Sequence, residues 1–329
     1  MNSVQTMRTT APVKTYIGPD SSRMVGDLLR EQGVDSVLIV TDKNIEAAGL
    51  LAGVEDSLRT AGCSFIVYDE TPADPPDTAV DRMCALCWEK RCQAVIAVGG
   101  GSCIDSGKCV AFMQRNPGRI RDYLLDPTLP RRKGVPFIAI PTTSGTGSEV
   151  TFGVVITDSQ SGRKIGAGGP EFFAAAGILD PLLTVGLPRS VTASTAMDAF
   201  AHAVESMLSG KSNPTCRLFA GEAVRLIAGN LEAVLSNGQD VSRRQHLMYA
   251  AYLAAMSVND GSCSLGHSIA HVLGAHYHIP HGAACAITVP MTIEFFASIF
   301  PERIRALGES MGITTCLLYT SDAADDLTR

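Results

Sequence analysis

Residues 94–102 read AVIAVGGGS and contain the junction that decides the fold, an apolar run that leads directly into three glycines. The run Ala94–Val98 is typical of a strand buried on both faces, and the residues after Ser102 predict a helix to about Gln114. Glycines at such a junction let the backbone approach a phosphate, whose charge the helix N-terminus favours. The stretch therefore predicts a phosphate-binding turn, although a plain tight turn also uses glycine and neither GxGxxG nor a Walker sequence is present.

Similar strand-like runs lie on both sides of this junction. We expect them at Val37–Thr41, Ser64–Tyr68, Pro136–Ile140, Val154–Thr157 and Gly177–Leu179, with helices over about 44–60 and 77–91. Because continuous apolar strands alternate with helices, the first half is expected to form a parallel sheet covered on both faces.

The pattern changes to helices alone from Ser190 onward. The expected helices span 190–208, 213–235, 240–258, 262–275, 283–299 and 301–310. We therefore predict an α/β protein with a Rossmann-like parallel-sheet domain over 1–184 and an all-α domain over 185–314, which form a cleft where they meet. Residues 315–329 (TCLLYTSDAADDLTR) fit neither pattern and are interpreted as a tail of translated adapter sequence outside the fold.

The composition excludes several classes of function. The chain has 329 residues, of which 46% are hydrophobic, and a net charge of −6 without a long basic run, which argues against nucleic acid or a membrane surface as a partner. No apolar run reaches membrane-spanning length and no signal core precedes the first strand, so we expect a cytoplasmic protein. The ten cysteines are expected to be buried free thiols, because a zinc knuckle at Cys84 and Cys87 would need a second pair.

Two further features are expected at the same edge of the sheet as the glycines. The segment Pro141–Ser148 (PTTSGTGS) follows a strand and offers hydroxyl groups around two glycines, as a ligand-binding loop or a simple helix cap would. Asp42 follows the strand that ends at Thr41, where a carboxylate can bind an adenosine ribose and repel a 2′-phosphate. This favours NAD over NADP, and a solvated turn aspartate is the alternative.

Five of the seven histidines lie within residues 262–284 (SCSLGHSIAHVLGAHYHIPHGAA). His267 and His271 are four residues apart and share one face of a helix, while His281 lies between Pro280 and Gly282, where a turn can direct it back. For His276 and His278 we expect a structural role. Each histidine alone fits an ordinary core or surface position, but the cluster indicates a metal or proton-transfer site.

An earlier helix supplies the rest of this candidate site. Asp198 and His202 are four residues apart in an apolar segment, and a buried carboxylate is costly unless it is paired or bound to a metal. With His267 and His281 they make a set of three imidazoles, one carboxylate and no thiolate. Such a set suits Fe²⁺ or Zn²⁺ with one position open for substrate.

Segments along the chain up to about residue 312 together resemble the iron-containing (group III) alcohol dehydrogenases. They are GGGSCIDSGK (99–108), PTTSGTGSEVT (141–151), ILDPLLTVGLP (178–188), TAMDAFAHAVES (195–206) and GHSIAHVLGAHYHIPHG (266–282). The resemblance implies a metal held by Asp198, His202, His267 and His281, with His271 beside the nicotinamide as a proton relay. It implies that the residues in contact with the cofactor are Asp42, Asp74, Gly100, Gly101, Ser102, Thr142, Thr143, Thr146 and Lys164.

Some positions depart from the family pattern. Asp74 stands where the family often has asparagine, and Phe152 stands where many members have a polar residue, so Phe152 either faces the pocket or packs in the protein. Cys263 and Cys285 flank the metal segment, and we assign neither as a ligand, although a thiol there is open to oxidation. The chain also ends before the family's final helices.

The resemblance implies a metal-dependent, NAD-linked alcohol dehydrogenase that acts on a small primary or secondary alcohol as a homodimer or larger homo-oligomer. The expected cofactors are NAD and Fe²⁺, with Zn²⁺ as the alternative metal. Three other functions stay open from the sequence. They are an enzyme like the 3-dehydroquinate synthases, a metal-free relative like the maleylacetate reductases, and an inactive truncated nucleotide-binding fragment.

Overall fold

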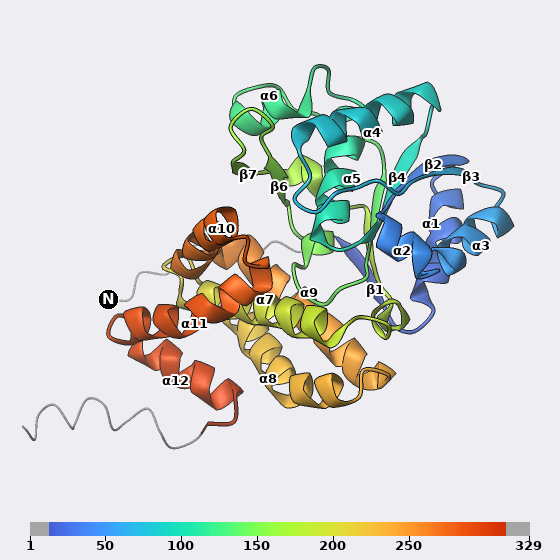
Figure 1. Ribbon diagram of the computed structural model, residues 1–329. Helices are drawn as coiled ribbons and strands as arrows, with labels where there is room; N and C mark the ends of the chain where they lie inside the picture. Colours follow the sequence, from blue (N-terminus) through green and yellow to red (C-terminus); the bar gives the residue numbers. More distant parts are fainter. Residues whose placement is uncertain (1–12, 314–329) are drawn as a thin grey trace, which may run out of the picture.

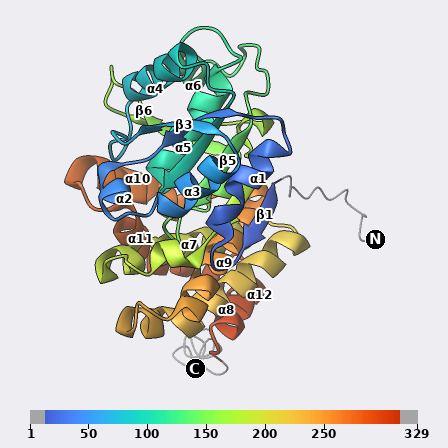
Figure 2. The same cartoon turned by 90° about the vertical axis from the view of Figure 1, so that its right-hand side faces the viewer.

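The computed structural model of the chain describes residues 13–313, which form an α/β part and an all-helical part side by side (Figure 1). In the perpendicular view α7, α8, α9, α11 and α12 lie below the sheet domain, and α10 lies beside it (Figure 2). The predicted tail at 315–329 lies outside the described residues. The predicted fold class is confirmed.

A six-stranded sheet forms the centre of the α/β part. Its strands lie in the order β1-β8-β5-β4-β2-β3, and every pair is parallel. They are β1 (Lys14–Ile17), β2 (Ser36–Val40), β3 (Ser64–Tyr68), β4 (Ala94–Gly99), β5 (Phe137–Pro141) and β8 (Ala176–Leu179). β4 and β5 are buried along their whole length, as their unbroken apolar sequences predict.

Helices cover both faces of this sheet because alternate strand residues point to opposite sides. Leu38 and Val40 of β2 join a core with α4 to α6, whereas Val37 and Ile39 join a second core with α1 and α3. The helices are α1 (Val25–Arg30), α2 (Lys43–Ala47), α3 (Ala52–Thr60), α4 (Asp77–Glu89), α5 (Gly101–Met113) and α6 (Ile120–Leu125). Cys84 and Cys87 lie in the first core as buried thiols.

Three details of the α/β part differ from the sequence prediction. The single helix expected over 44–60 is divided into α2 and α3, because Gly49 adopts a left-handed φ of 70° between them. The strand expected at 154–157 exists as β6 (Gly153–Thr157), but it pairs antiparallel with β7 (Lys164–Gly168) and not with the main sheet. Neither β1 nor β7 is among the strands expected from the sequence.

Six helices make up the second part. They are α7 (Arg189–Leu208), α8 (Pro214–Ser236), α9 (Val241–Gly261), α10 (Leu265–Tyr277), α11 (His281–Ala297) and α12 (Pro301–Ser310). Buried alanines such as Ala199, Ala203 and Ala254 fill much of their core, and small side chains allow helices to approach closely. α10 begins three residues later than expected, because Ser262 ends α9 with a φ of 67°. α11 begins two residues earlier, at His281.

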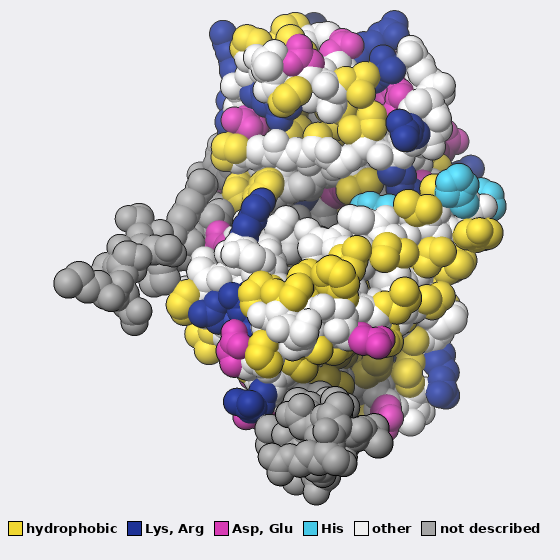
Figure 3. Space-filling model, turned by 90° about the vertical axis from the view of Figure 1, so that its left-hand side faces the viewer, with side chains coloured by type: hydrophobic (Ala, Val, Ile, Leu, Met, Phe, Trp, Pro, Cys, Tyr) yellow, Lys and Arg dark blue, Asp and Glu magenta, His cyan; other side chains and the backbone are white. Residues whose placement is uncertain are grey.

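Part of the helical surface is apolar. Hydrophobic side chains form a band across the helical part in the view of Figure 3. Exposed large apolar residues of α10 and α11 are Val272, Tyr277, Ile287, Met291 and Phe295. Within residues 13–313, none of the helices combines the length and apolar character needed to cross a membrane.

Candidate metal and nucleotide site

The direction of the chain reverses in the sheet between β2 and β4. From β2 the chain proceeds outward to β3, then returns to β4 on the other side of β2 and continues to β5. In open parallel sheets, ligands bind beyond the carboxyl ends of the strands at such a switch point. Asp42 follows β2 and Gly99–Ser102 follows β4, so the topology brings both sequence-predicted cofactor segments to this edge.

The glycine segment and the threonine segment lie against each other. A Cβ at Gly101 would lie 2.9 Å from Thr146 Cγ2, and one at Gly100 would lie 3.8 Å from Thr143 Cγ2. The Thr142 amide donates a hydrogen bond to the Gly99 carbonyl (3.0 Å), which holds the two segments together. The two loops therefore form one surface, bordered by the N-terminus of α5.

Other predicted cofactor residues line the same edge. Asp42 caps α2, and its Oδ1 accepts hydrogen bonds from the amides of Asn44 (2.8 Å) and Ile45 (3.2 Å). The Asp74 amide donates to Ser102 Oγ (3.3 Å), and the Asp74 carboxylate pairs with Lys164 Nζ at 2.6 Å. Lys164 is thus engaged with Asp74. The second oxygen of Asp42 remains available to a ligand apart from a weak contact with Cys103 Sγ (3.6 Å).

Phe152 packs against other parts of the protein. Its ring meets that of Phe173 edge-on at a centroid distance of 5.7 Å. A Cβ at Gly168 would lie 2.9 Å from the Phe152 ring. Of the two roles considered from the sequence, the packed one agrees with these contacts.

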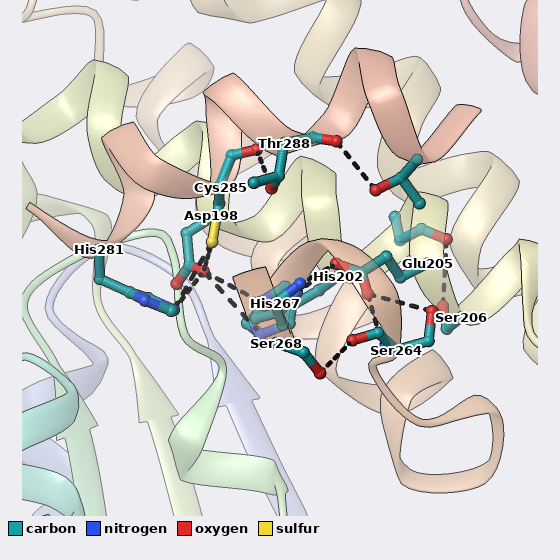
Figure 4. Close-up of polar contacts among 12 residues, drawn as sticks. Asp198, His202, Glu205, Ser206, Ser264, His267, Ser268, His281, Cys285 and Thr288 are labelled. Atoms are coloured by element: carbon teal, nitrogen blue, oxygen red, sulfur yellow. Dashed lines mark hydrogen bonds and ion pairs between the residues drawn. The ribbon is translucent and has the colours of Figure 1, made fainter. Parts of the chain in front are cut away.

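The four predicted metal donors converge at one carboxylate oxygen (Figure 4). Asp198 Oδ1 lies 3.3 Å from His281 Nε2, 3.5 Å from His267 Nε2 and 4.0 Å from His202 Nε2. Asp198 and His202 come from successive turns of α7, His267 from the start of α10 and His281 from the start of α11. The structure thus brings together four residues that are up to 83 positions apart in sequence (281 − 198).

A second carboxylate fixes the orientation of one imidazole. Glu205 Oε1 lies 2.5 Å from His267 Nδ1 and also accepts the His267 backbone N–H at 2.9 Å, while Oε2 accepts the Ser264 N–H at 2.6 Å. Nδ1 therefore donates to Glu205, which leaves Nε2 facing Asp198 as the nitrogen that could bind a metal. A carboxylate that holds a ligand histidine in this way is typical of metal sites.

The buried groups fit a divalent cation. His267 is 6% exposed, yet its Nε2 has no hydrogen-bond partner among the described residues. Two donors bound at about 2.1 Å to one tetrahedral ion would be about 3.4 Å apart, close to the two shorter separations from Asp198 Oδ1. Three nitrogens and one oxygen are also donors that Fe²⁺ and Zn²⁺ accept.

The pKa values of the clustered side chains also indicate a site that suits a cation. Burial raises the pKa of Asp198, but the surrounding imidazoles outweigh it and hold that pKa well below its usual range. Burial lowers the pKa of His281, while Asp198 and Cys285 raise it to about 10. The pKa values of His202 and His267 are also raised against the effect of burial. The space between Asp198 and the three imidazoles thus favours a positive charge.

The open side of the cluster lies at His281. The His281 side chain is 34% exposed, against 4% for Asp198 and 7% for His267. The exposed ring of His271 lies beside it at a centroid distance of 5.3 Å. The loop at 141–148 packs close by, since a Cβ at Gly145 would lie 2.8 Å from Thr195, one turn before Asp198. The cluster is therefore accessible from the side of His281 and His271.

One residue of this cluster, Glu205, is not predicted from the sequence, and two others, Cys263 and Cys285, are noted there without a role as ligands. Glu205 lies seven positions after Asp198, on the same face of α7, and that spacing in an apolar helix was the available signal. Cys285 lies four positions after His281 and belongs to a compact group of possible donors with Asp198, His267 and His281. Cys263 groups with His202 and His267. Both thiols had been set aside as non-ligands, although the structure gives them positions next to the donors.

His276 and His278 lie away from this group. Both are exposed at the end of α10, where His278 follows the last helical residue with a φ of 55°. His278 thus ends the helix in a left-handed conformation.

Two family models match the chain. The model described as iron-containing alcohol dehydrogenase matches residues 12–181, which contain the nucleotide edge. The model described as the C-terminal part of the Fe-containing alcohol dehydrogenase family matches residues 192–328, which contain the four donors.

Characterised proteins are similar over most of the chain. The NAD-dependent methanol dehydrogenase of Bacillus methanolicus is 33% identical over 95% of this chain and 82% of its own length. The 1,3-propanediol dehydrogenase of Citrobacter freundii is 34% identical over 95% of this chain and 81% of its own length.

Solved structures have the same fold. The crystal structure of a 1,3-propanediol oxidoreductase has a TM-score of 0.92 at 33% identity and covers 98% of this chain and 84% of its own. The sulfoacetaldehyde reductase of Bifidobacterium kashiwanohense, solved in complex with NAD⁺, has a TM-score of 0.84 at 26% identity and covers 98% and 91%.

Proposed function

The chain belongs to the iron-containing alcohol dehydrogenase family, and on that premise we propose that the cluster around Asp198 is the centre of its reaction. The protein is an NAD-linked alcohol dehydrogenase that interconverts alcohols with aldehydes or ketones. Small primary or secondary alcohols are its proposed substrates. The observation that carries the proposal is the convergence of three imidazole nitrogens on one buried carboxylate oxygen beside the nucleotide edge.

In this proposal Asp198, His202, His267 and His281 hold a divalent metal, Fe²⁺ or alternatively Zn²⁺. Such an ion, when bound, supplies a Lewis acid that lowers the pKa of an alcohol hydroxyl. The protein's own contribution is to keep the donors buried and to fix the His267 ring through Glu205. The 34% exposure of His281 leaves one side of the cluster open to a small alcohol.

The nicotinamide dinucleotide, the second reactant, is proposed to bind at the nucleotide edge, which comprises Asp42, Gly99–Ser102 and the loop at 141–148. We assign the pyrophosphate to Gly100, Gly101 and Ser102, where α5 begins without a side-chain cap and offers its first amides. Thr143 and Thr146 line the same surface, and Thr142 lies beneath it with a buried side chain. Asp42 binds the adenosine ribose and repels a 2′-phosphate, so NAD is preferred to NADP. Asp74 and Lys164 form an ion pair at the rim.

We assign to His271 the transfer of the proton that the reaction releases. Oxidation of an alcohol transfers a hydride from carbon to C4 of NAD⁺ and releases the hydroxyl proton. The exposed ring of His271 lies beside His281. Burial and the nearby His281 and His267 lower the pKa of His271 to about 4, so the ring passes the proton on to solvent and does not retain it. We further propose that the enzyme works in the cytoplasm as a homodimer or larger homo-oligomer.

The test is a substrate panel. Protein reconstituted with Fe²⁺, and in parallel with Zn²⁺, is incubated with short alcohols and diols and either NAD⁺ or NADP⁺, and nicotinamide reduction is followed by absorbance. We expect turnover with NAD⁺ on at least one alcohol and slower turnover with NADP⁺. Folded protein that binds both metal and NADH but oxidises no alcohol would contradict the proposal and favour an inactive nucleotide-binding protein.

A further inference from the structure

Cys285 stands closer to the metal donors than a residue of the apolar core needs to. It lies one turn after His281 on α11 and is fully buried. Its Sγ lies 3.7 Å from Asp198 Oδ1 and 3.7 Å from His281 Nε2. In Figure 4 the sulfur points toward both groups.

We propose that Cys285 binds the metal through Sγ, together with Asp198, His267 and His281, and that this thiolate biases the centre toward Zn²⁺. The inference rests on the proposed function, because it concerns the same metal centre. The donor set would then contain one sulfur that the four-residue assignment leaves out. Binding releases the thiol proton, since a thiolate is the form that binds metals.

The distances carry this proposal. Sulfur binds Zn²⁺ at about 2.3 Å and nitrogen or oxygen at about 2.1 Å, so a sulfur and a second donor on one tetrahedral ion lie about 3.6 Å apart. Both distances from Cys285 Sγ agree with this value. The possible ligand atoms of Asp198, His267, His281 and Cys285 all lie within 4.8 Å of one another. His267 Nε2, which is buried and has no hydrogen-bond partner within residues 13–313, completes the group.

His202 has a less central position than the family assignment implies. Its Nε2 lies 4.0 Å from Asp198 Oδ1, the longest of the three imidazole distances. Its ring is stacked on that of His267 at a centroid distance of 4.5 Å and an angle of 16°. Cys285 therefore joins the four proposed donors, at distances from Asp198 and His281 shorter than that of His202 from Asp198.

The choice of metal follows from donor chemistry. Thiolate is a soft ligand that Zn²⁺ accepts readily, whereas oxygen and imidazole donors alone discriminate less between Zn²⁺ and Fe²⁺. Cys263 provides an internal comparison, because it is a second thiol that groups with His202 and His267 without Asp198 or His281. The alternative for Cys285 is a thiol that only donates a hydrogen bond to Asp198.

X-ray absorption at the zinc edge tests the proposal on the unaltered protein. Zinc-loaded enzyme should show a sulfur neighbour at about 2.3 Å in addition to nitrogen and oxygen neighbours. A spectrum with nitrogen and oxygen alone would overturn the proposal while leaving the metal centre and the proposed function intact. Failure to bind zinc or any other divalent metal would instead refute the metal centre itself.

Cobalt substitution identifies which thiol is involved. Co²⁺-loaded wild type and Cys263→Ser should both show the near-ultraviolet thiolate-to-cobalt charge-transfer band, and Cys285→Ser should lose it while still binding Co²⁺. Competition between Zn²⁺ and Fe²⁺ should shift toward Fe²⁺ in Cys285→Ser alone. Retention of the band in Cys285→Ser, or its loss in Cys263→Ser, would overturn the assignment.

Discussion

Glu205 is the residue through which the protein controls its central imidazole. It makes three contacts of 2.5–2.9 Å, one to His267 Nδ1 and two to backbone amides at the start of α10. Because it binds Nδ1, it leaves Nε2 as the nitrogen available to the proposed metal. A single side chain therefore positions both the ring and the helix that carries it.

Replacing this carboxylate should weaken metal binding without removing any ligand. Glu205→Gln keeps the size of the side chain but no longer polarises the imidazole, so we expect metal affinity to fall by about 10- to 100-fold. Chelator competition measures this, with Glu222→Gln, which alters an exposed pair with Arg225, as the control. Equal affinity in both variants would show that Glu205 is merely structural.

His271 should affect turnover and not metal content. Its ring lies 6.4 Å from that of His267 and 5.3 Å from that of His281, beside the donors and not among them. In His271→Ala we expect kcat to fall by about 100-fold or more, the usual contribution of a proton-transfer group. His276→Ala is the matched control, and elemental analysis checks the metal. Loss of metal from His271→Ala would make His271 a ligand.

At the scale of elements, the site depends on the close crossing of α7 and α11. Gly282 follows His281 at the start of α11, and a Cβ there would overlap the backbone carbonyl of Ser194 on α7. Only glycine allows α11 to approach closely enough for His281 to reach Asp198. The close packing of α11 on α7 therefore determines how near His281 lies to Asp198, two of the proposed metal donors.

A methyl group at this crossing should displace α11. We expect Gly282→Ala to lower the free energy of unfolding by about 1–3 kcal/mol through overpacking and to weaken metal binding. Gly229→Ala on α8 is the matched control, because a Cβ there meets nothing within 4 Å and should raise stability by about 1 kcal/mol. Urea unfolding and metal content report both effects. If Gly282→Ala and Gly229→Ala had the same stability and metal content, the close approach of α7 and α11 would not be what positions His281.

Most elements could be predicted from the sequence because their patterns are local. The central strands are unbroken apolar runs, and the helices have the expected periodicity. β7 (KIGAG) lacks such a run, and the break at Gly49 lies in a segment whose other residues favour a helix. These two features depend on backbone conformation and pairing that composition does not encode.

The site was predictable to the extent that its residues are costly to bury. Asp198 and the histidines were recognised because apolar helices seldom carry them without a partner. Cys285 was not, since a buried cysteine in an apolar segment also fits an ordinary core position. Its position beside Asp198 depends on how α7 and α11 pack, which only the structure provides.

At the scale of the whole molecule, the two parts meet around η2 (Ser148–Val150). Val150 packs with Ala255 and Met256 of α9 in a small core. Glu149, next to it, is 2% exposed. Burial raises its pKa to about 7, against the smaller opposing effects of its own backbone amide and of Lys108. A carboxyl group that titrates near neutral pH thus lies at the junction.

This carboxyl group should make stability depend on pH. Because its pKa rises from 4.5 in the unfolded chain to about 7, the folded protein binds more protons in that interval and loses stability as pH rises through it. Glu149→Gln cannot lose a proton. The change in its free energy of unfolding relative to wild type should be near its acid value below about pH 4.5. Above about pH 7 the variant should be more stable than that by the order of 3 kcal/mol.

Urea unfolding at several pH values measures this difference. Glu302→Gln, at an exposed position on α12, serves as the control and should follow the wild type. A difference between Glu149→Gln and wild type that stays constant from acid to neutral pH would refute the predicted titration at the junction.

On this mechanism, alcohol oxidation requires a metal held at Asp198. The most direct measurement is NADH formation while metal-free protein is titrated anaerobically with Fe²⁺ in the presence of NAD⁺ and the best alcohol of the panel. Turnover should begin near zero, rise in proportion to bound metal and level off at about one equivalent per chain, and Asp198→Ala should show neither binding nor turnover. Undiminished turnover in the metal-free protein, or in Asp198→Ala, would contradict the account.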